Sequence, residues 1–239
     1  MIDNKKYYDS FSRTYDKTRD RGYHDLIDTI ETHAVRDHYT GGSILEAGCG
    51  SGLVLQKIRS FADGSFGIDL SNGMLKHAKN RKCSVAQADI LTLPFQDNAF
   101  DMVVSFKVLP HILSIGEAIM ELCRITKPGG ILILEFYNTR SLRGMIKRLK
   151  LPTKTSKKYS DMDVYTRYDS RAAILQLMPD DMDCIEFRGA RIITPFAAVH
   201  RIPVLQTFFK RMELSLSTTS AAAAAGFIIY IGKKRTTCV

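Results

Sequence analysis

The sequence predicts an α/β domain with a doubly wound, mostly parallel sheet, and the order of its strand ends carries this prediction. Two apolar runs end in a carboxylate, at Glu46 and at Asp69, and Asp69 comes 23 residues after Glu46. A third acid follows at Asp89, and residues 100–106 form another apolar run. This spacing fits βαβ units, in which the carboxyl ends of parallel strands meet at one edge of the sheet. Four strand ends are therefore expected to converge.

Glycines follow the first apolar run at every second position, at Gly48, Gly50 and Gly52, before a helical segment at residues 53–58. A glycine has no Cβ atom, so a ligand can lie directly on this backbone. The first amides of the following helix attract a carboxylate or a phosphate. The turn therefore predicts a site for a nucleotide-like cofactor.

The order of the glycines distinguishes two classes of cofactor. A dinucleotide fingerprint reads G-x-G-x-x-G, whereas here the third glycine comes one residue early and an acid precedes the first by two residues. The order E-A-G-C-G-S-G at residues 46–52 resembles motif I of class I S-adenosylmethionine-dependent methyltransferases. The similarity continues in order to about residue 138, through the segments at 67–71 with Met74, 88–95, 100–105 and 122–134.

This resemblance implies S-adenosylmethionine as the cofactor and assigns contacts at its methionine and ribose ends. Glu46, Gly48 and Gly50 would lie beside the methionine part, and Asp69 would accept hydrogen bonds from the ribose. Taken alone, an acid such as Asp69 also fits an ordinary solvated side chain at a strand end. The further cofactor-binding residues that we expect are Ala47, Cys49, Gly52, Leu70 and Met74.

The resemblance also assigns the adenine, the sulfonium and a lid. Asp89 and Ile90 would flank the adenine, with Asp89 accepting from its amino group. Ser105 and Phe106, at the end of the fourth strand, would lie near the sulfonium and the incoming acceptor. Tyr15 would be the lid residue on an N-terminal helix that closes over the cofactor, although an aromatic stripe that packs this helix down fits equally well.

The resemblance further implies a seven-stranded, Rossmann-like sheet whose last strand is antiparallel. Residues 183–193 and 226–232 would be the sixth and seventh strands, with the seventh between the fifth and the sixth. Residues 170–178 are expected to form a helix that Ser170 caps. The connection between the last two strands is longer than this fold needs, and its apolar residues recur every three or four positions. Residues 195–225 are therefore expected to be a helical insertion, either a cap over the acceptor pocket or a packing or dimerisation element.

The net charge of +9 is concentrated in one segment, residues 139–165. Within it, residues 140–158 hold eight basic and no acidic side chains, whereas the rest of the chain holds 26 basic against 25 acidic residues. Apolar residues recur there at helical spacing, which predicts a short amphipathic helix. Such a helix can lie on an anionic membrane surface or hold an acidic substrate, and a solvated helix with one face on the sheet fits as well.

The chain of 239 residues is expected to form one domain, because 45% hydrophobic side chains can fill one large core. Its expected parts are N-terminal lid helices in residues 1–40, a cofactor-binding core in 41–138, the basic segment and the insertion. Neither an apolar leader nor a run of about 18 apolar residues occurs, which favours a cytoplasmic protein. The five cysteines are scattered without a C-x-x-C pair, so we expect free thiols and no metal site. A monomer or a homodimer is expected.

Methyl transfer from a sulfonium is an in-line displacement, so the site must hold the acceptor close and exclude water. A base is needed only when the acceptor must lose a proton. His111 is the main candidate, because the fold places it at the mouth of the pocket, where it would begin the helix after the fourth strand. It is also consistent with a structural residue at a helix start. His24 and His200 are weaker candidates.

The residues after the fourth strand, Ser105 to Val108, lack the D/N-P-P-Y/F motif with which some enzymes grip a flipped nucleic-acid base. The expected acceptor is therefore a small molecule, methylated at O, N or C in quinone-like or natural-product biosynthesis, and not a nucleic acid. A membrane-associated or anionic acceptor remains an alternative. Two other functions stay open, namely a non-catalytic protein that binds S-adenosylmethionine and an NAD-dependent oxidoreductase.

Overall fold

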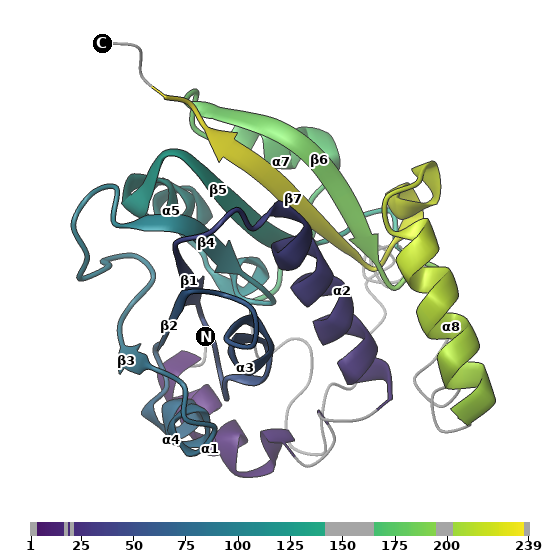
Figure 1. The fold of residues 1–239 in the computed structure, drawn as a ribbon, viewed down its shortest axis with the longest axis horizontal. Helices are drawn as coiled ribbons and strands as arrows, with labels where there is room; N and C mark the ends of the chain where they lie inside the picture. The colour runs from purple at the N-terminus through teal and green to yellow at the C-terminus, as the bar shows by residue number, and fades with distance from the viewer. Residues whose placement is uncertain (1–3, 17–18, 20–21, 142–164, 195–202, 237–239) are drawn as a thin grey trace.

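The computed structural model describes residues 4–16, 19, 22–141, 165–194 and 203–236. These residues form one mixed sheet with helices on both faces (Figure 1). The strands are β1 (Ser43–Ala47), β2 (Gly64–Asp69), β3 (Val85–Gln87), β4 (Phe100–Ser105), β5 (Thr126–Tyr137), β6 (Met182–Ala190) and β7 (Phe227–Lys234). The α-helices are α1 (Asn4–Tyr15), α2 (Tyr23–His38), α3 (Leu53–Ile58), α4 (Asn72–Asn80), α5 (Ile115–Ile125), α7 (Arg171–Leu177) and α8 (Pro203–Leu216). The 3-10 helices are η2 (Leu109–His111) and η4 (Ser220–Ala224).

The sheet has seven strands in the order β3-β2-β1-β4-β5-β7-β6. The first five strands pair in parallel, and β7 runs antiparallel to both β5 and β6. This confirms the predicted fold class and the place of the seventh strand. The strand order reverses between β1 and β4, and in open α/β sheets ligands bind at the carboxyl ends of the strands at such a switch point.

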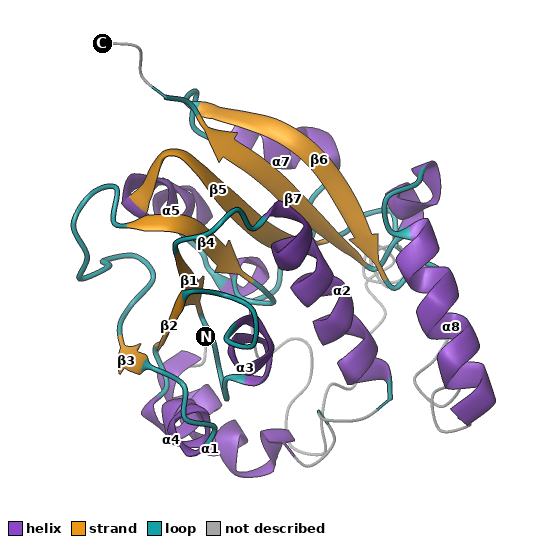
Figure 2. Cartoon of the chain, in the orientation of Figure 1, coloured by secondary structure: helices purple, strands orange, loops and turns teal. Residues whose placement is uncertain are grey.

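The central strands are apolar on both sides because helices cover both faces of the sheet. Neighbouring residues of β1 therefore enter different layers: Ile44 packs with residues of α2 and α3, and Leu45 packs with residues of α5 and α7. Figure 2 shows α2 and α3 in front of the sheet and α5 and α7 behind it. The two layers fix the strand ends that build the cavity described below.

Serine caps begin two of the helices. Ser71 Oγ accepts a hydrogen bond from Met74 N at 3.1 Å and starts α4. Ser170 Oγ accepts one from Ala173 N at 3.2 Å and starts α7, which confirms the predicted cap. Each cap satisfies an amide of the first turn that has no partner within its own helix.

The element bounds differ from expectation near His111 and at the end of β6. The helix after β4 begins at Ile115, and His111 instead ends η2, because the backbone of Ile112 is extended and interrupts the helical path. β6 ends at Ala190, before Arg191 with its left-handed φ of 63°. The predicted helix in the basic segment falls on residues 142–164, outside the described residues. Within the described part of the chain, no helix combines the length and apolarity that crossing a membrane needs.

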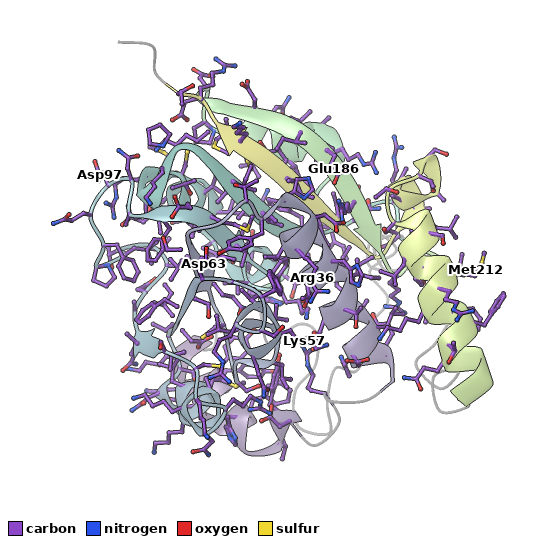
Figure 3. The ribbon with its side chains drawn as sticks, viewed as in Figure 1. Arg36, Lys57, Asp63, Asp97, Glu186 and Met212 are labelled. Atoms are coloured by element: carbon purple, nitrogen blue, oxygen red, sulfur yellow. The ribbon has the colours of Figure 1, made fainter. Side chains whose placement is uncertain are left out.

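The insertion forms α8 and η4, and its residues 195–202 lie outside the described residues. Glu213 on α8 accepts hydrogen bonds from the backbone N–H groups of residues 192, 193 and 194, at 2.7, 3.0 and 2.9 Å. Lys210 Nζ lies 3.3 Å from Asp25 Oδ2 on α2. Met212 points away from the body of the protein (Figure 3). The helix is therefore held beside α2 and the end of β6.

Candidate functional site

The cofactor turn joins β1 to α3, and β2 fixes its backbone. The N–H groups of Gly48 and Cys49 both donate to Ile68 O, at 2.7 and 2.8 Å. Gly48 has a φ of +80°, and a Cβ atom there would run into the Val108 side chain. Gly50 has a φ of +53°, and no heavy atom lies within 4 Å of its Cβ position. Glycine suits both places, so the turn presents bare backbone to open space.

Asp69 at the end of β2 holds the turn from the side. Its Oδ2 accepts a hydrogen bond from Gly50 N at 2.8 Å, and its Oδ1 accepts one from Ser71 N at 2.8 Å. Burial raises the pKa of Asp69, although these two N–H groups act in the opposite direction. The carboxylate is therefore held at the end of β2, against the backbone of the glycine turn.

A cavity opens at the carboxyl ends of β1, β2 and β4, with an empty volume of about 1000 Å³ that includes space open to solvent. Twelve of the predicted site residues line this cavity. They come from four strand ends, from α1, from α4 and from η2. The predicted residues in its lining are Tyr15, Glu46, Gly48, Cys49, Gly50, Asp69, Leu70, Met74, Asp89, Ile90, Phe106 and His111. The spacing of the sequence motifs thus brings these side chains together.

Three predicted cofactor residues, Ala47, Gly52 and Ser105, lie outside the lining. Ser105 is buried and donates its hydroxyl hydrogen to Ala47 O at 2.9 Å, tying β4 to β1. Successive strand residues point to opposite sides, so Phe106 reaches the cavity and Ser105 does not. Gly52 faces Ala78 on α4. The side chain of Ser105 therefore holds the end of β1, where the cofactor turn begins. The expectation was a position in the cavity, beside the sulfonium.

Helix α1 places two tyrosines against the cavity. Tyr8 and Tyr15 line it, and burial raises the pKa of both phenols. The Tyr7 ring instead stacks on Phe11, with 5.7 Å between the ring centres. The aromatic stripe therefore both packs the helix and forms part of the cavity wall.

Arg19, in the segment before α2, also lines the cavity. Its guanidinium carbon lies 4.8 Å from the centre of the Tyr15 ring, and one terminal nitrogen lies 3.4 Å from Asp28 Oδ1. Its Nε is buried and has no hydrogen-bond partner among the described residues. Because a buried polar group is costly without a partner, this nitrogen is suited to a ligand anion.

A buried charge cluster lies beneath α2 beside the cavity. Lys107 follows β4 with a left-handed φ of 60°, and its Nζ lies 2.8 Å from both Asp28 Oδ1 and Glu31 Oε1. The two acids are three residues apart on α2 and so share one face of the helix. Burial opposes the charge of Lys107, but the carboxylates of Glu31 and Asp28 outweigh it and raise its pKa. The cluster anchors the cavity-lining chain after β4 to α2.

Glu135 on β5 lies buried beside this cluster. Its carboxyl group is fully buried, and neither of its oxygens has a hydrogen-bond partner among the described residues. Burial, together with the negative charge of Glu31, raises the pKa of Glu135 well above its ordinary value, which favours the neutral acid. Burial and Glu31 also raise the pKa of Glu46, whose Oε2 has no hydrogen-bond partner among the described residues.

We expect Glu135→Gln to remove part of the pH dependence of stability. The unfolded chain releases the Glu135 proton near pH 4.5, while the folded chain keeps it, so the free energy of unfolding of the parent falls as pH rises above this value. Glutamine is a neutral side chain of the same shape and has no proton to lose. Urea unfolding is measured at several pH values between about 5 and 8. The free energy of unfolding of the variant, relative to that of the parent, should increase as the pH rises. A difference that stays constant with pH would contradict the protonated state of Glu135.

His111 lies between two groups at the edge of the cavity. Its Nδ1 is 2.9 Å from Tyr165 O, and its Nε2 is 3.3 Å from Tyr137 Oη. A carbonyl oxygen only accepts, so in the neutral ring Nδ1 carries the hydrogen and the lone pair is on Nε2. Nε2 is therefore the ring nitrogen that could take a proton from a methyl-acceptor molecule.

Of the other two base candidates, only His24 lies among the described residues, and it does not line the cavity. His24 lies on α2 outside the lining, and burial, with Arg19 and Lys107 nearby, lowers its pKa to about 4. His200 falls outside the described residues, as do all of residues 195–202 in the expected cap. No described residue of α8 or η4 lines the cavity. Among the described side chains, no group of three or more His, Cys, Asp or Glu could hold a metal ion.

Sequence reasoning missed the charge cluster and Arg19. A signal for the cluster exists, because Asp28 and Glu31 stand among buried apolar positions of α2, such as Ile27 and Ile30. Acids on the apolar face of a helix call for a buried partner. The partner, Lys107, lies about eighty residues along the chain, and no local pattern connects it to α2.

A comparison with protein families finds a match to the methyltransferase domain over residues 45–134. Residues 45–134 therefore form a methyltransferase domain, and the chain is similar to class I S-adenosylmethionine-dependent methyltransferases. This family implies S-adenosylmethionine as the cofactor, and the matched span contains the cofactor turn, Asp69, Asp89 and His111. The predicted family and cofactor are thus confirmed.

Curated relatives and solved structures resemble this methyltransferase to different extents. It is 37% identical over 142 residues to a malonyl-[acyl-carrier protein] O-methyltransferase of Buchnera aphidicola, covering 56% of this chain and 55% of that one. It is 31% identical over 104 residues to a demethylmenaquinone methyltransferase of Corynebacterium urealyticum, covering 44% and 45%. The chain thus spans about half the length of the curated relatives it matches.

A solved structure matches nearly the whole fold. A possible histamine N-methyltransferase from Thermotoga maritima superposes with a TM-score of 0.68 at 19% identity, covering 97% of this chain and 99% of that one. At this identity the likeness shows the fold alone, including the antiparallel last strand.

Proposed function

We propose that this protein transfers the methyl group of S-adenosylmethionine to an oxygen, nitrogen or carbon atom of a small-molecule acceptor. The observation that carries the proposal is the cavity at the switch point of the sheet, where bare backbone, strand-end acids and a tyrosine-bearing helix meet. When bound, S-adenosylmethionine supplies an electrophilic methyl group on a positively charged sulfur. The residues of the chain bind, orient and shield the reactants.

The cavity residues fit the cofactor at both ends. Arg19 Nε and Glu46 Oε2 are buried atoms without hydrogen-bond partners among the described residues, and both side chains line the cavity. Their opposite charges suit the carboxylate and the ammonium of an amino acid, and an ammonium beside Glu46 would favour its ionised form. Asp69 suits the ribose hydroxyls, and Asp89 with Ile90 suits an adenine.

The acceptor would occupy the part of the cavity lined by Tyr8, His111 and Ile112. These aromatic and apolar side chains suit a small, partly apolar molecule. His111 Nε2 would take the acceptor proton where one must leave. Two relatives act by name on a malonyl group carried by a protein and on demethylmenaquinone, and two others are named probable tRNA methyltransferases, so the class of acceptor rests on the cavity lining and on the experiment below. The acid-free stretch at residues 140–158 supports a membrane-associated or anionic acceptor as the alternative.

Transfer of a labelled methyl group tests the proposed activity. The protein is incubated with S-adenosylmethionine labelled in the methyl group and with a metabolite extract, with and without anionic phospholipid vesicles. We expect label in one extract component, in amounts that depend on the protein. Gly48→Val, whose side chain would run into Val108, is the inactive control. Binding of S-adenosylhomocysteine without transfer of label under any condition would favour a non-catalytic cofactor-binding protein.

A further inference from the structure

The segment of α1 is hydrogen-bonded to both ends of α4, and the two helices lie side by side (Figure 1). Asp9 Oδ1 accepts hydrogen bonds from Ser71 Oγ at 2.6 Å and from Gly73 N at 2.9 Å, at the start of α4. At the other end of α4, Asp16 Oδ2 accepts one from Arg81 at 2.8 Å. We call these contacts of Asp9 and Asp16 the two latches of α1.

Each latch continues in hydrogen bonds to the cofactor turn. Ser71, which donates to Asp9, also donates its N–H to Asp69 Oδ1, and Asp69 Oδ2 holds Gly50 N. Arg81, which donates to Asp16, also donates to Ser51 O at 2.9 Å. Two chains of hydrogen bonds therefore run from α1 to the backbone on which the cofactor would lie.

The contact between the helices leaves no space at the first latch. A Cβ atom on Gly73 would lie 2.7 Å from Ser12 Oγ and 3.2 Å from Asp9 Cα, so α1 rests directly on the first turn of α4. The hydrogen bonds from Ser71 and Gly73 lower the pKa of Asp9, which keeps its carboxylate charged. A negative charge at a helix N-terminus is favourable, so Asp9 strengthens the start of α4.

We propose that Asp9, with Asp16 at the opposite end of α4, is a positioning residue that holds α1 closed over the cofactor cavity. Tyr8 and Tyr15, which form part of the cavity wall, are carried by α1, and α1 in turn lies on α4. A ligand that engages Asp69 and the turn then stabilises the closed position of α1, and closure of α1 stabilises the bound ligand by the same factor. This inference rests on the proposed function, because it requires that the cavity bind S-adenosylmethionine.

Hydrogen exchange and calorimetry, each with S-adenosylhomocysteine as the probe, test the latch on the intact chain. For Asp9→Ala we expect faster exchange of the α1 amides without ligand, and a dissociation constant about tenfold or more above that of the parent. Asp9→Asn should restore both, because one oxygen, Oδ1, accepts both hydrogen bonds and an amide oxygen can do the same.

Two further variants separate the latch from general effects on folding. Gly73→Ala favours the helical state of α4, yet its methyl group would press α1 away, so it should act like Asp9→Ala. Asp37→Ala is the matched control, because Asp37 Oδ2 accepts a comparable hydrogen bond from Arg188 at 2.6 Å, between α2 and β6. It should leave the exchange of α1 and the binding of the probe unchanged.

Different outcomes would refute the positioning role of Asp9 and the proposed methyltransferase function. If the parent binds the probe and Asp9→Ala binds it equally well, the latch is refuted and the proposed function stands. The latch is also refuted if exchange of α1 rises in Asp9→Ala without loss of affinity. If the parent does not bind the probe, the proposed function fails and the coupling fails with it.

Discussion

Replacing Lys107 by methionine is expected to lower the free energy of unfolding by about 3 kcal/mol. The change leaves Asp28 and Glu31 beneath α2 without the cation that lies 2.8 Å from both. Breaking a buried ion pair on one side costs about 3 to 5 kcal/mol, because the remaining charge has lost its water and its partner. The side chain of Lys107 is 19% exposed, so we expect the lower end of this range.

Urea unfolding of the parent, of Lys107→Met, of Glu31→Gln and of the double variant that combines the two changes measures this effect. The double variant should lose less stability than Lys107→Met alone, because it also removes one uncompensated carboxylate. Stability of Lys107→Met within about 1 kcal/mol of the parent would contradict the role of the cluster. So would a double variant that loses the sum of the two single losses.

The second large effect concerns turnover. We expect His111→Ala to lower kcat by about 100-fold or more, if the acceptor must lose a proton, and to leave the affinity for S-adenosylhomocysteine nearly unchanged. The neutral ring presents its lone pair on Nε2, because Nδ1 donates to Tyr165 O. Acidification protonates Nε2, so the fall in kcat of the parent on the acid side should be absent in the variant.

The measurement is steady-state kinetics across pH on the acceptor fraction that the labelled-methyl experiment identifies. Added imidazole should restore part of the turnover of His111→Ala, which a purely structural role would not allow. His33→Ala is the matched control, because His33 is an exposed histidine on α2 that does not line the cavity. Turnover of His111→Ala at the parent level with the parent pH profile would exclude the base role.

The sequence allowed the sheet and much of the cavity to be predicted because their signals are local. Glu46 and Asp69 lie at the carboxyl ends of β1 and β2, and Asp89 follows β3. The parallel topology alone brings such strand ends together. Gly48 was predictable for a different reason. Glycines at every second position indicate a tight turn, and Gly48 and Gly50 both adopt a positive φ that favours glycine. Ser105 was predicted to lie beside the sulfonium but does not line the cavity. Its side chain points toward Ala47, because side chains alternate between the two faces of a strand.

The rest could not be predicted because it depends on contacts between segments far apart in the sequence. Lys107 contacts Asp28 from a backbone with a left-handed φ, which nothing in the sequence requires of a lysine. Asp9 and Ser71 are 62 residues apart, and their hydrogen bond exists only once α1 has docked. The bounds of η2 were missed because Pro110 fits a 3-10 turn as well as the first turn of an α-helix.

The central claim is that the cavity binds S-adenosylmethionine through the turn and Asp69. Calorimetric titration of the parent and of Asp69→Ala with S-adenosylhomocysteine, and with NAD as the competing cofactor class, tests it most directly. We expect one site in the parent, a dissociation constant about 10- to 100-fold higher in Asp69→Ala through lost ribose hydrogen bonds, and no binding of NAD. Equal affinity of both proteins for S-adenosylhomocysteine, or tighter binding of NAD by the parent, would contradict the account.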